Sequence, residues 1–141
     1  MKPTPIILPA GAGRSYDCGP MRAVFKADGA ETAERYSVSE WTVAPRSPGS
    51  GPHAHDQSDE LFLVTEGTMA VRVGDDWIEA GRGAFIRIPA GTVHDFENRT
   101  DLPATLFNVF LPGAFEHLMP EIVKWFSPSP PQAAPTAAAK P

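Results

Sequence analysis

The feature that most constrains this fold is a series of short segments rich in β-branched and aromatic residues, separated by Gly, Pro, Asn and Asp. Segments bounded by turn residues in this way are typical of β-strands. Gly74-Asp75-Asp76 forms one expected hairpin turn, and Gly91 is free to take the positive φ of another. Many short strands joined by tight turns predict an all-β sandwich or closed barrel. The expected strands span residues 36–43, 60–64, 68–73, 77–80, 84–88, 93–97 and 105–110.

The two ends of the chain carry different signals. Apolar residues recur at helical spacing over residues 114–126, which predicts one helix that Pro120 interrupts or kinks. A short strand is also expected at residues 22–26. Residues 127–141 are mostly Pro, Ala and Ser, so they bury too little apolar surface to offset the cost of ordering and are expected to form a disordered tail. The sequence therefore predicts one folded domain over residues 1–126.

Charge and composition argue against several classes of partner. The formal net charge is −5 and no basic run interleaved with aromatic residues appears, whereas binding to nucleic-acid phosphates requires a basic face. Residues 6–8 are too short an apolar run for a signal peptide, and no apolar stretch approaches membrane-spanning length. Cys18 is the only cysteine, which excludes an intramolecular disulfide. We expect a cytoplasmic protein that contacts neither nucleic acid nor a membrane.

Three of the four histidines fall beside turns and strands together with one glutamate. His53 and His55 are two residues apart, so both rings project to the same face if the segment is extended. Glu60 begins the next apolar strand, and His94 follows a turn into another. Imidazole and carboxylate together suit first-row divalent metals. The alternative for each histidine alone is a hydrogen-bonded core residue or a solvated loop residue.

The two histidine segments resemble the two sequence motifs of the cupin superfamily. Residues 52–60 read PHAHDQSDE and resemble the first motif, while residues 83–94 read GAFIRIPAGTVH and resemble the second. The first motif usually opens with a glycine where this chain has Ser47. Two glycines lie nearby, so we interpret this as a small loop difference that leaves the metal ligands in place.

The resemblance implies a double-stranded β-helix, the cupin jelly-roll barrel, with one divalent transition metal inside it. It assigns the ligands to His53, His55, Glu60 and His94, and leaves the metal open among Fe, Mn, Ni, Co, Cu and Zn. The short turn between the motifs is similar to that of small one-barrel bacterial cupins, and the approach to the C-terminal helix is similar to one-barrel proteins described as quercetin-dioxygenase-like. Many of these are homodimers, so a homodimer is expected here.

Strand alternation suggests which other side chains line the barrel. If Glu60 points inward then Phe62 does too, and if His94 points inward then Phe96 follows. Either phenylalanine is a candidate aromatic wall for a substrate, with plain barrel core as the alternative. Further candidates for contact with a substrate are Phe115 and Met119 from the helix and the polar residues Arg46 and Gln57.

These residues support three functions of different classes. The first is a metal-dependent dioxygenase acting on a small aromatic or enol-like substrate, with Glu60 also accepting a hydroxyl proton. The second is an isomerase, decarboxylase or hydrolase in which the same ligands hold a Lewis acid. The third is a non-enzymatic protein that binds a small ligand, because a fold does not by itself specify a function.

Overall fold

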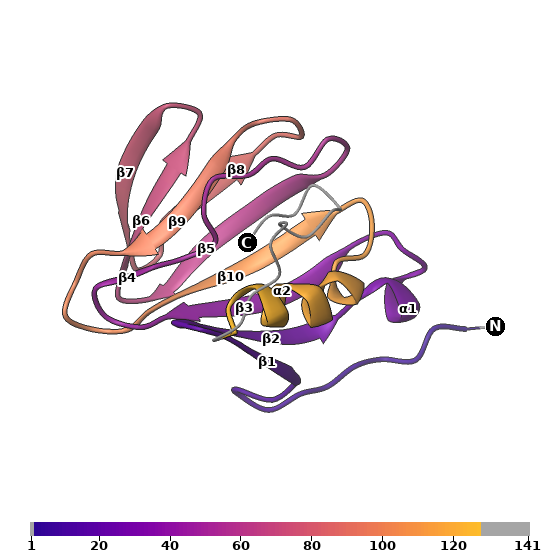
Figure 1. The fold of residues 1–141 in the computed structure, drawn as a ribbon. Helices are drawn as coiled ribbons and strands as arrows, with labels where there is room; N and C mark the ends of the chain where they lie inside the picture. The colour runs from indigo at the N-terminus through magenta and orange to yellow at the C-terminus, as the bar shows by residue number, and fades with distance from the viewer. Residues whose placement is uncertain (1, 128–141) are drawn as a thin grey trace.

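The computed structural model describes residues 2–127 and confirms an all-β jelly roll with a C-terminal helix (Figure 1). Its strands form two antiparallel sheets that face each other. The larger sheet has the strand order β1-β2-β3-β10-β5-β8 and the smaller has the order β4-β9-β6-β7. The elements are β1 (Arg14–Cys18), β2 (Met21–Ala27), α1 (Gly29–Thr32), β3 (Ser37–Val43), β4 (Ser47–Pro48), β5 (Asp59–Glu66), β6 (Thr68–Val73), β7 (Asp76–Gly81), β8 (Phe85–Ile88), β9 (His94–Asn98), β10 (Ala104–Leu111), the 3-10 helix η1 (Glu116–Leu118) and α2 (Met119–Trp125).

All seven strands expected between residues 36 and 110 are present, with ends within two residues of the prediction, and the strand expected at residues 22–26 is β2. Strand β1 was not predicted. It pairs with β2 at the edge of the larger sheet, and its sequence RSYDC lacks the alternation of apolar residues that marks a half-buried strand. The two-residue β4 and the four-residue α1 are too short to leave a periodic pattern.

The C-terminal helical segment begins two residues later than predicted. Residues 114 and 115 precede the 3-10 turn η1, and α2 begins only at Met119. The segment is thus divided in two just before Pro120, in agreement with the expected interruption, and the proline lies in the first turn of α2, where a missing N–H leaves no hydrogen bond unmade. The predicted tail falls, apart from its first residue, outside the described part of the chain.

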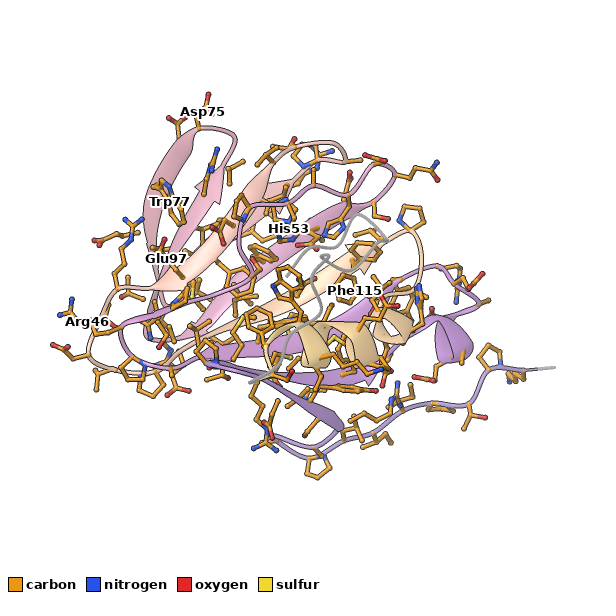
Figure 2. All side chains as sticks on the ribbon, in the orientation of Figure 1. Arg46, His53, Asp75, Trp77, Glu97 and Phe115 are labelled. Atoms are coloured by element: carbon orange, nitrogen blue, oxygen red, sulfur yellow. The ribbon has the colours of Figure 1, made fainter. Side chains whose placement is uncertain are left out.

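Figure 2 shows how the side chains are distributed over this scaffold. Asp75 lies at the tip of the β6–β7 hairpin, far from Phe115, which lies beside the C-terminal helical segment. The smaller sheet covers only part of the larger one, and α2 packs beside β1 with Met119 and Ile122 fully buried. Among residues 2–127, no helix is long and apolar enough to cross a membrane.

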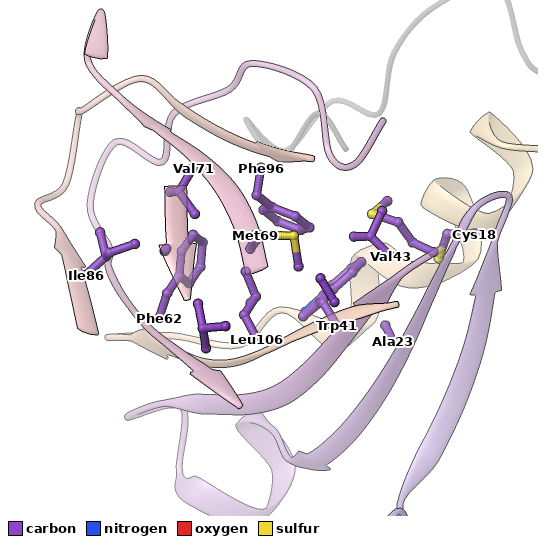
Figure 3. Packing of buried hydrophobic residues seen from close by; sticks show 14 of the residues in the cluster. Cys18, Ala23, Trp41, Val43, Phe62, Met69, Val71, Ile86, Phe96 and Leu106 are labelled. Carbon is purple, nitrogen blue, oxygen red and sulfur yellow. The ribbon is translucent and has the colours of Figure 1, made fainter. Parts of the chain in front are cut away.

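The hydrophobic core lies between the sheets (Figure 3). Its side chains come from alternate positions of each strand, so that β5 contributes Phe62 and Val64 while Leu63 between them faces outward. Cys18 is completely buried at the end of β1, and burial raises the pKa of its thiol to about 12. This agrees with a structural role for the cysteine, because a reactive cysteine requires a thiolate.

Candidate metal centre

Two chain segments running side by side bring the predicted ligands together. His53 forms an isolated antiparallel bridge with His94, the first residue of β9. The N–H of His53 donates to the carbonyl of His94 at 3.0 Å, and the N–H of His94 donates to the carbonyl of His53 at 2.8 Å. The N–H of Gly91 donates to the carbonyl of His55 at 2.7 Å. Glu60 enters from β5 in the facing sheet, so the backbone fixes the position of each side chain.

The four side chains offer ligand atoms that all lie within 4.8 Å of one another. Two atoms bound on opposite sides of one first-row ion are about 4.2 Å apart, so the spacing fits such an ion after small side-chain rotations. His55, Glu60 and His94 are buried, and His53, labelled in Figure 2 beside β9, is half-buried. The cluster therefore has one side closer to solvent than the others.

The hydrogen bonds of the imidazoles fit a metal ion. Nδ1 of His53 lies 2.7 Å from the carbonyl of Gly51, and Nδ1 of His94 lies 2.9 Å from the carbonyl of Thr92. A carbonyl oxygen can only accept, so each Nδ1 carries a proton, and in its neutral form each ring presents the lone pair of Nε2. Metal-bound histidines commonly have this arrangement, because the second hydrogen bond fixes the ring.

The remaining polar atoms of the cluster are close but not hydrogen-bonded in good geometry. Nε2 of His55 lies 2.9 Å from Oε1 of Glu60, and Nε2 of His94 lies 3.3 Å from Oε2. Both nitrogens are nevertheless buried without an aligned partner in the described part of the chain. Leaving buried polar atoms unsatisfied is costly. An ion bound between the rings and the carboxylate would satisfy these atoms together, so the residues present fit a divalent metal.

The charges of the cluster are strongly coupled. Burial raises the pKa of Glu60, but contact with His55 and His94 more than offsets this, so the net pKa lies well below its ordinary value. Burial lowers the pKa of His53 to about 4, so its ring is neutral at pH 7. Burial also lowers the pKa of His94, but the adjacent Glu60 carboxylate outweighs it and the net shift is upward. A carboxylate among three imidazoles is a site for a cation.

Aromatic side chains surround the cluster. Between ring centroids, Phe110 lies 5.0 Å from His55. Phe115 lies 6.0 Å from His55 and 5.3 Å from Phe110 by the same measure. Phe62 is fully buried, and its ring centroid lies 6.2 Å from that of His94 on one side and 5.8 Å from that of Phe96 on the other. Of the two expected aromatic walls, Phe62 therefore lies beside the cluster, whereas Phe96 packs behind it against the core.

The other predicted contact residues are spread more widely. Met119 is fully buried in the core cluster that α2 covers. Arg46 forms an exposed ion pair with Asp101 at 2.8 Å and lies at the far end of the barrel from His53 (Figure 2). Gln57 is exposed on the loop that precedes β5. The structure therefore groups Phe62 and Phe115 with the metal cluster and leaves Arg46 apart from it.

Polar residues that sequence reasoning missed lie beside Glu60. Ser37, Ser39 and Asn108 are buried and border a small chamber together with Glu60. Their signal was in the alternation of β3 and β10, where inward positions that would normally hold apolar residues hold polar ones. The strand prediction contained this information, but it required knowing which face of each strand points inward.

Comparison with known proteins agrees with this geometry. Residues 39–110, about half of the chain, match the family model described as Cupin domain. A stretch of 65 residues is 35% identical to quercetin 2,3-dioxygenase of Bacillus subtilis (strain 168) and covers 45% of this chain. The match spans only 19% of that relative, about a fifth of its length.

Solved structures share the fold. The polyketide cyclase RemF of Streptomyces resistomycificus superposes with a TM-score of 0.67 at 21% identity, over 79% of this chain and 82% of its own. A sugar phosphate isomerase of the cupin superfamily from Silicibacter pomeroyi superposes with a TM-score of 0.58 at 27% identity, over 65% of this chain and 59% of its own. With its family match, its jelly roll and its cluster of three histidines and one glutamate, this chain belongs to the cupin domain family.

Proposed function

We propose that this protein is a metal-dependent enzyme of the dioxygenase type that acts on a small aromatic or enol-like substrate inside the barrel. The observation that carries the proposal is the convergence of three imidazoles and one carboxylate on a buried point beside aromatic rings. The partial similarity to quercetin 2,3-dioxygenase of Bacillus subtilis supports the reaction class.

In this proposal His53, His55, Glu60 and His94 hold one divalent transition metal. The bound ion supplies a Lewis acid and, if it is redox-active, a site for O2 chemistry. Glu60 has a second task, which is to accept the proton of a substrate hydroxyl at a carboxylate oxygen. Its buried position keeps that oxygen away from bulk water.

The aromatic side chains have a binding role in this proposal. Phe110 and Phe115 lie within 6.0 Å of His55, measured between ring centroids, and Phe62 closes the inner side next to His94. Flat rings prefer stacked or edge-to-face contacts with other flat rings. An aromatic or enol-like substrate therefore suits these walls better than a bulky saturated one, and the walls exclude water from the reacting atoms.

A second candidate is a metal-dependent isomerase, for which the resemblance to the sugar phosphate isomerase at 27% identity is the specific support. The same four ligands would hold a Lewis acid that polarises a carbonyl, and Glu60 would move a proton between carbons. This candidate needs neither O2 nor a redox-active metal, and that difference makes the two candidates separable by experiment.

The deciding experiment measures metal content and O2 consumption on the same protein preparation. We expect one equivalent of iron, manganese, nickel, cobalt or copper and O2 uptake that depends on a flavonol or an enediol. His55→Ala should lose both, while the matched control His117→Ala, which removes an exposed histidine outside the cluster, should retain both. Stoichiometric zinc, or a redox metal without O2 uptake, would favour the isomerase.

We also propose that the protein forms a homodimer and that residues 1–126 are its folded unit. The outer face of the larger sheet supports a subunit contact, because Leu63 and Phe85 are 40% and 63% exposed beside Phe107 and Val109. Light scattering should give twice the mass of the chain. Replacing Phe85 by Ser should shift the protein toward the monomer without loss of bound metal.

A further inference from the structure

A stripe of polar side chains crosses the inner face of the larger sheet next to the metal cluster. Along β3 the first inward positions hold Ser37 and Ser39, and the later inward positions hold apolar residues. Along β10 one inward position holds Asn108. All three residues are at least nine-tenths buried. Polar residues at core positions cost stability unless they are fully hydrogen-bonded, so a stripe of them needs an explanation.

The strand register brings these side chains to Glu60. Asn108 pairs with Ser39 on one side and with Phe62 on the other, and Phe110 pairs with Ser37 on one side and with Glu60 on the other. The polar stripe and the metal-binding carboxylate therefore share one end of the sheet. The Nδ2 group of Asn108 donates to Oε2 of Glu60 at 3.4 Å, which connects the stripe to the cluster.

These residues border a small chamber. Aromatic side chains form its other walls and leave about 10 Å³ for the centre of a water-sized atom, which is room for one such group. Phe115 is the wall that lies on a connecting segment rather than on a strand. The chamber is lined by Ser37, Ser39, Trp41, Glu60, Asn108, Phe110 and Phe115.

Two polar atoms of the chamber have no hydrogen-bond partner among residues 2–127. Oδ1 of Asn108 accepts no hydrogen bond, and the contact of Nδ2 with Glu60 fixes which end of the amide faces the chamber. Oγ of Ser37 also lacks an aligned partner, although its proximity to Asp28 contributes to lowering the pKa of that carboxyl. The hydroxyl of Ser39, by contrast, accepts from Nε1 of Trp41 at 2.9 Å.

We propose that this chamber binds one hydroxyl group of the substrate and selects for it. The hydroxyl donates to Oδ1 of Asn108 and accepts from Oγ of Ser37, which satisfies both unpartnered atoms at once. The chamber has room for an oxygen atom but not for a carboxylate or a phosphate. This inference rests on the proposed function, in that the rest of the substrate lies at the metal cluster, and it makes Ser37 and Asn108 specificity-determining residues.

The selectivity follows from the cost of an unmade hydrogen bond. A substrate that lacks the hydroxyl leaves Asn108 and Ser37 buried without partners, and a site built in this way rejects such an analogue strongly. An apolar chamber of the same size would discriminate weakly. The expected signature is therefore a preference for the hydroxylated member of a matched pair of ligands.

The test measures binding to the zinc-loaded protein by calorimetry, so that no turnover occurs. The probes are 3-hydroxyflavone against flavone and catechol against phenol, pairs that each differ by one hydroxyl. Wild-type protein should prefer the hydroxylated member. Ser37→Ala should reduce this preference about tenfold. The control Ser15→Ala, which makes the same change on the exposed edge strand β1, should leave it unchanged. A preference that came only from chelation of zinc by the hydroxyl would be the same in wild type, Ser37→Ala and Ser15→Ala.

A second measurement separates ligand selection from a structural role. If Ser37 serves binding, Ser37→Ala should keep its zinc, because no hydrogen bond joins Ser37 to a metal-binding residue within residues 2–127. Asn108→Leu should also lose the preference, and in addition bind zinc more weakly, because it loses the contact to Glu60. An unchanged preference in Ser37→Ala would overturn the proposal, as would wild-type protein that binds neither member of a pair or both equally. Failure of the proposed function is seen separately, as absent O2 uptake by wild-type protein.

Discussion

The two ends of the barrel interior are built on the same strands but differ in chemistry. At one end, β3, β5 and β10 present apolar side chains such as Val43, Val64 and Leu106, which pack against the smaller sheet. At the other end the same strands present Ser37, Glu60 and Asn108. Every one of these side chains points inward by the same alternation, so the difference lies only in the residue type.

This difference shows how one barrel separates stability from function. Burial of apolar side chains at the first end contributes the free energy that holds the sheets together. Burial of polar groups at the second end costs free energy, and it leaves Nε2 of His55 and Oδ1 of Asn108 without aligned partners. A fold keeps such groups where a ligand will satisfy them, as proteins commonly give up some stability at functional sites.

The largest effect on stability is expected at the apolar end. Leu106→Ala removes a fully buried side chain and should lower the free energy of unfolding by about 2–5 kcal/mol, because it leaves a cavity in the core. Urea unfolding followed by circular dichroism measures this. Metal content at saturating metal should not change. The control Leu102→Ala alters a side chain that is 69% exposed and should stay within about 0.5 kcal/mol of wild type. Equal losses in both variants would show that burial of Leu106 contributes nothing to stability.

At the polar end the expected change is in metal binding. His55→Ala should weaken metal binding by more than about 100-fold, because the loss of a ligand exceeds the loss of a supporting contact. The barrel should still fold with the circular dichroism spectrum of wild type. Elemental analysis after dialysis measures the metal, with His117→Ala as control. Full metal occupancy in His55→Ala would remove this histidine from the ligand set.

A smaller effect is expected where the C-terminal segment meets the polar end. Oδ1 of Asp28 accepts from the N–H groups of Phe115 at 2.9 Å and Glu116 at 3.0 Å. Burial raises the pKa of Asp28, but these hydrogen bonds and the nearby Ser37 hydroxyl more than offset this and the net pKa is lowered. Asp28→Asn keeps an acceptor but loses the charge, so it should cost about 1–2 kcal/mol at pH 7.

The pH dependence of that cost follows from the sign of the shift. Because the folded pKa of Asp28 lies below the unfolded value of about 3.9, its contribution is fully present above that value and is lost as the pH falls through the folded pKa. The stability difference between wild type and Asp28→Asn should therefore be constant from pH 7 to pH 5 and should shrink below pH 4. A difference that grows with acidification would show that Asp28 is not ionised in the native protein.

The smallest effect is expected outside both ends. Removal of residues 127–141, whose composition of Pro, Ala and Ser offers little apolar surface for packing, should shift the melting temperature by less than about 2 °C. Differential scanning calorimetry of the full and shortened chains measures this. A large fall in melting temperature would show that these residues contribute to the folded domain.

The site could be predicted only in part, and its polar stripe shows why. The cupin motifs gave the four residues that the structure brings within metal-binding distance, because the motifs combine residue type with turn spacing. Ser37 and Asn108 belong to no motif, and a lone serine or asparagine in a strand is most often a surface residue. Arg46 was a reasonable candidate by charge, yet the chain directs it to Asp101 instead.

The sequence by itself determined the strands, because alternation and turn residues act over a few positions and can be detected without knowing the fold. It also determined the metal-binding residue types. The tertiary structure alone decided which strand faces meet, because pairing β3 with β10 and β10 with β5 joins segments far apart in the chain. That pairing converts three unremarkable polar residues into one chamber beside Glu60, since proximity there is set by hydrogen-bond register between strands and not by distance along the sequence.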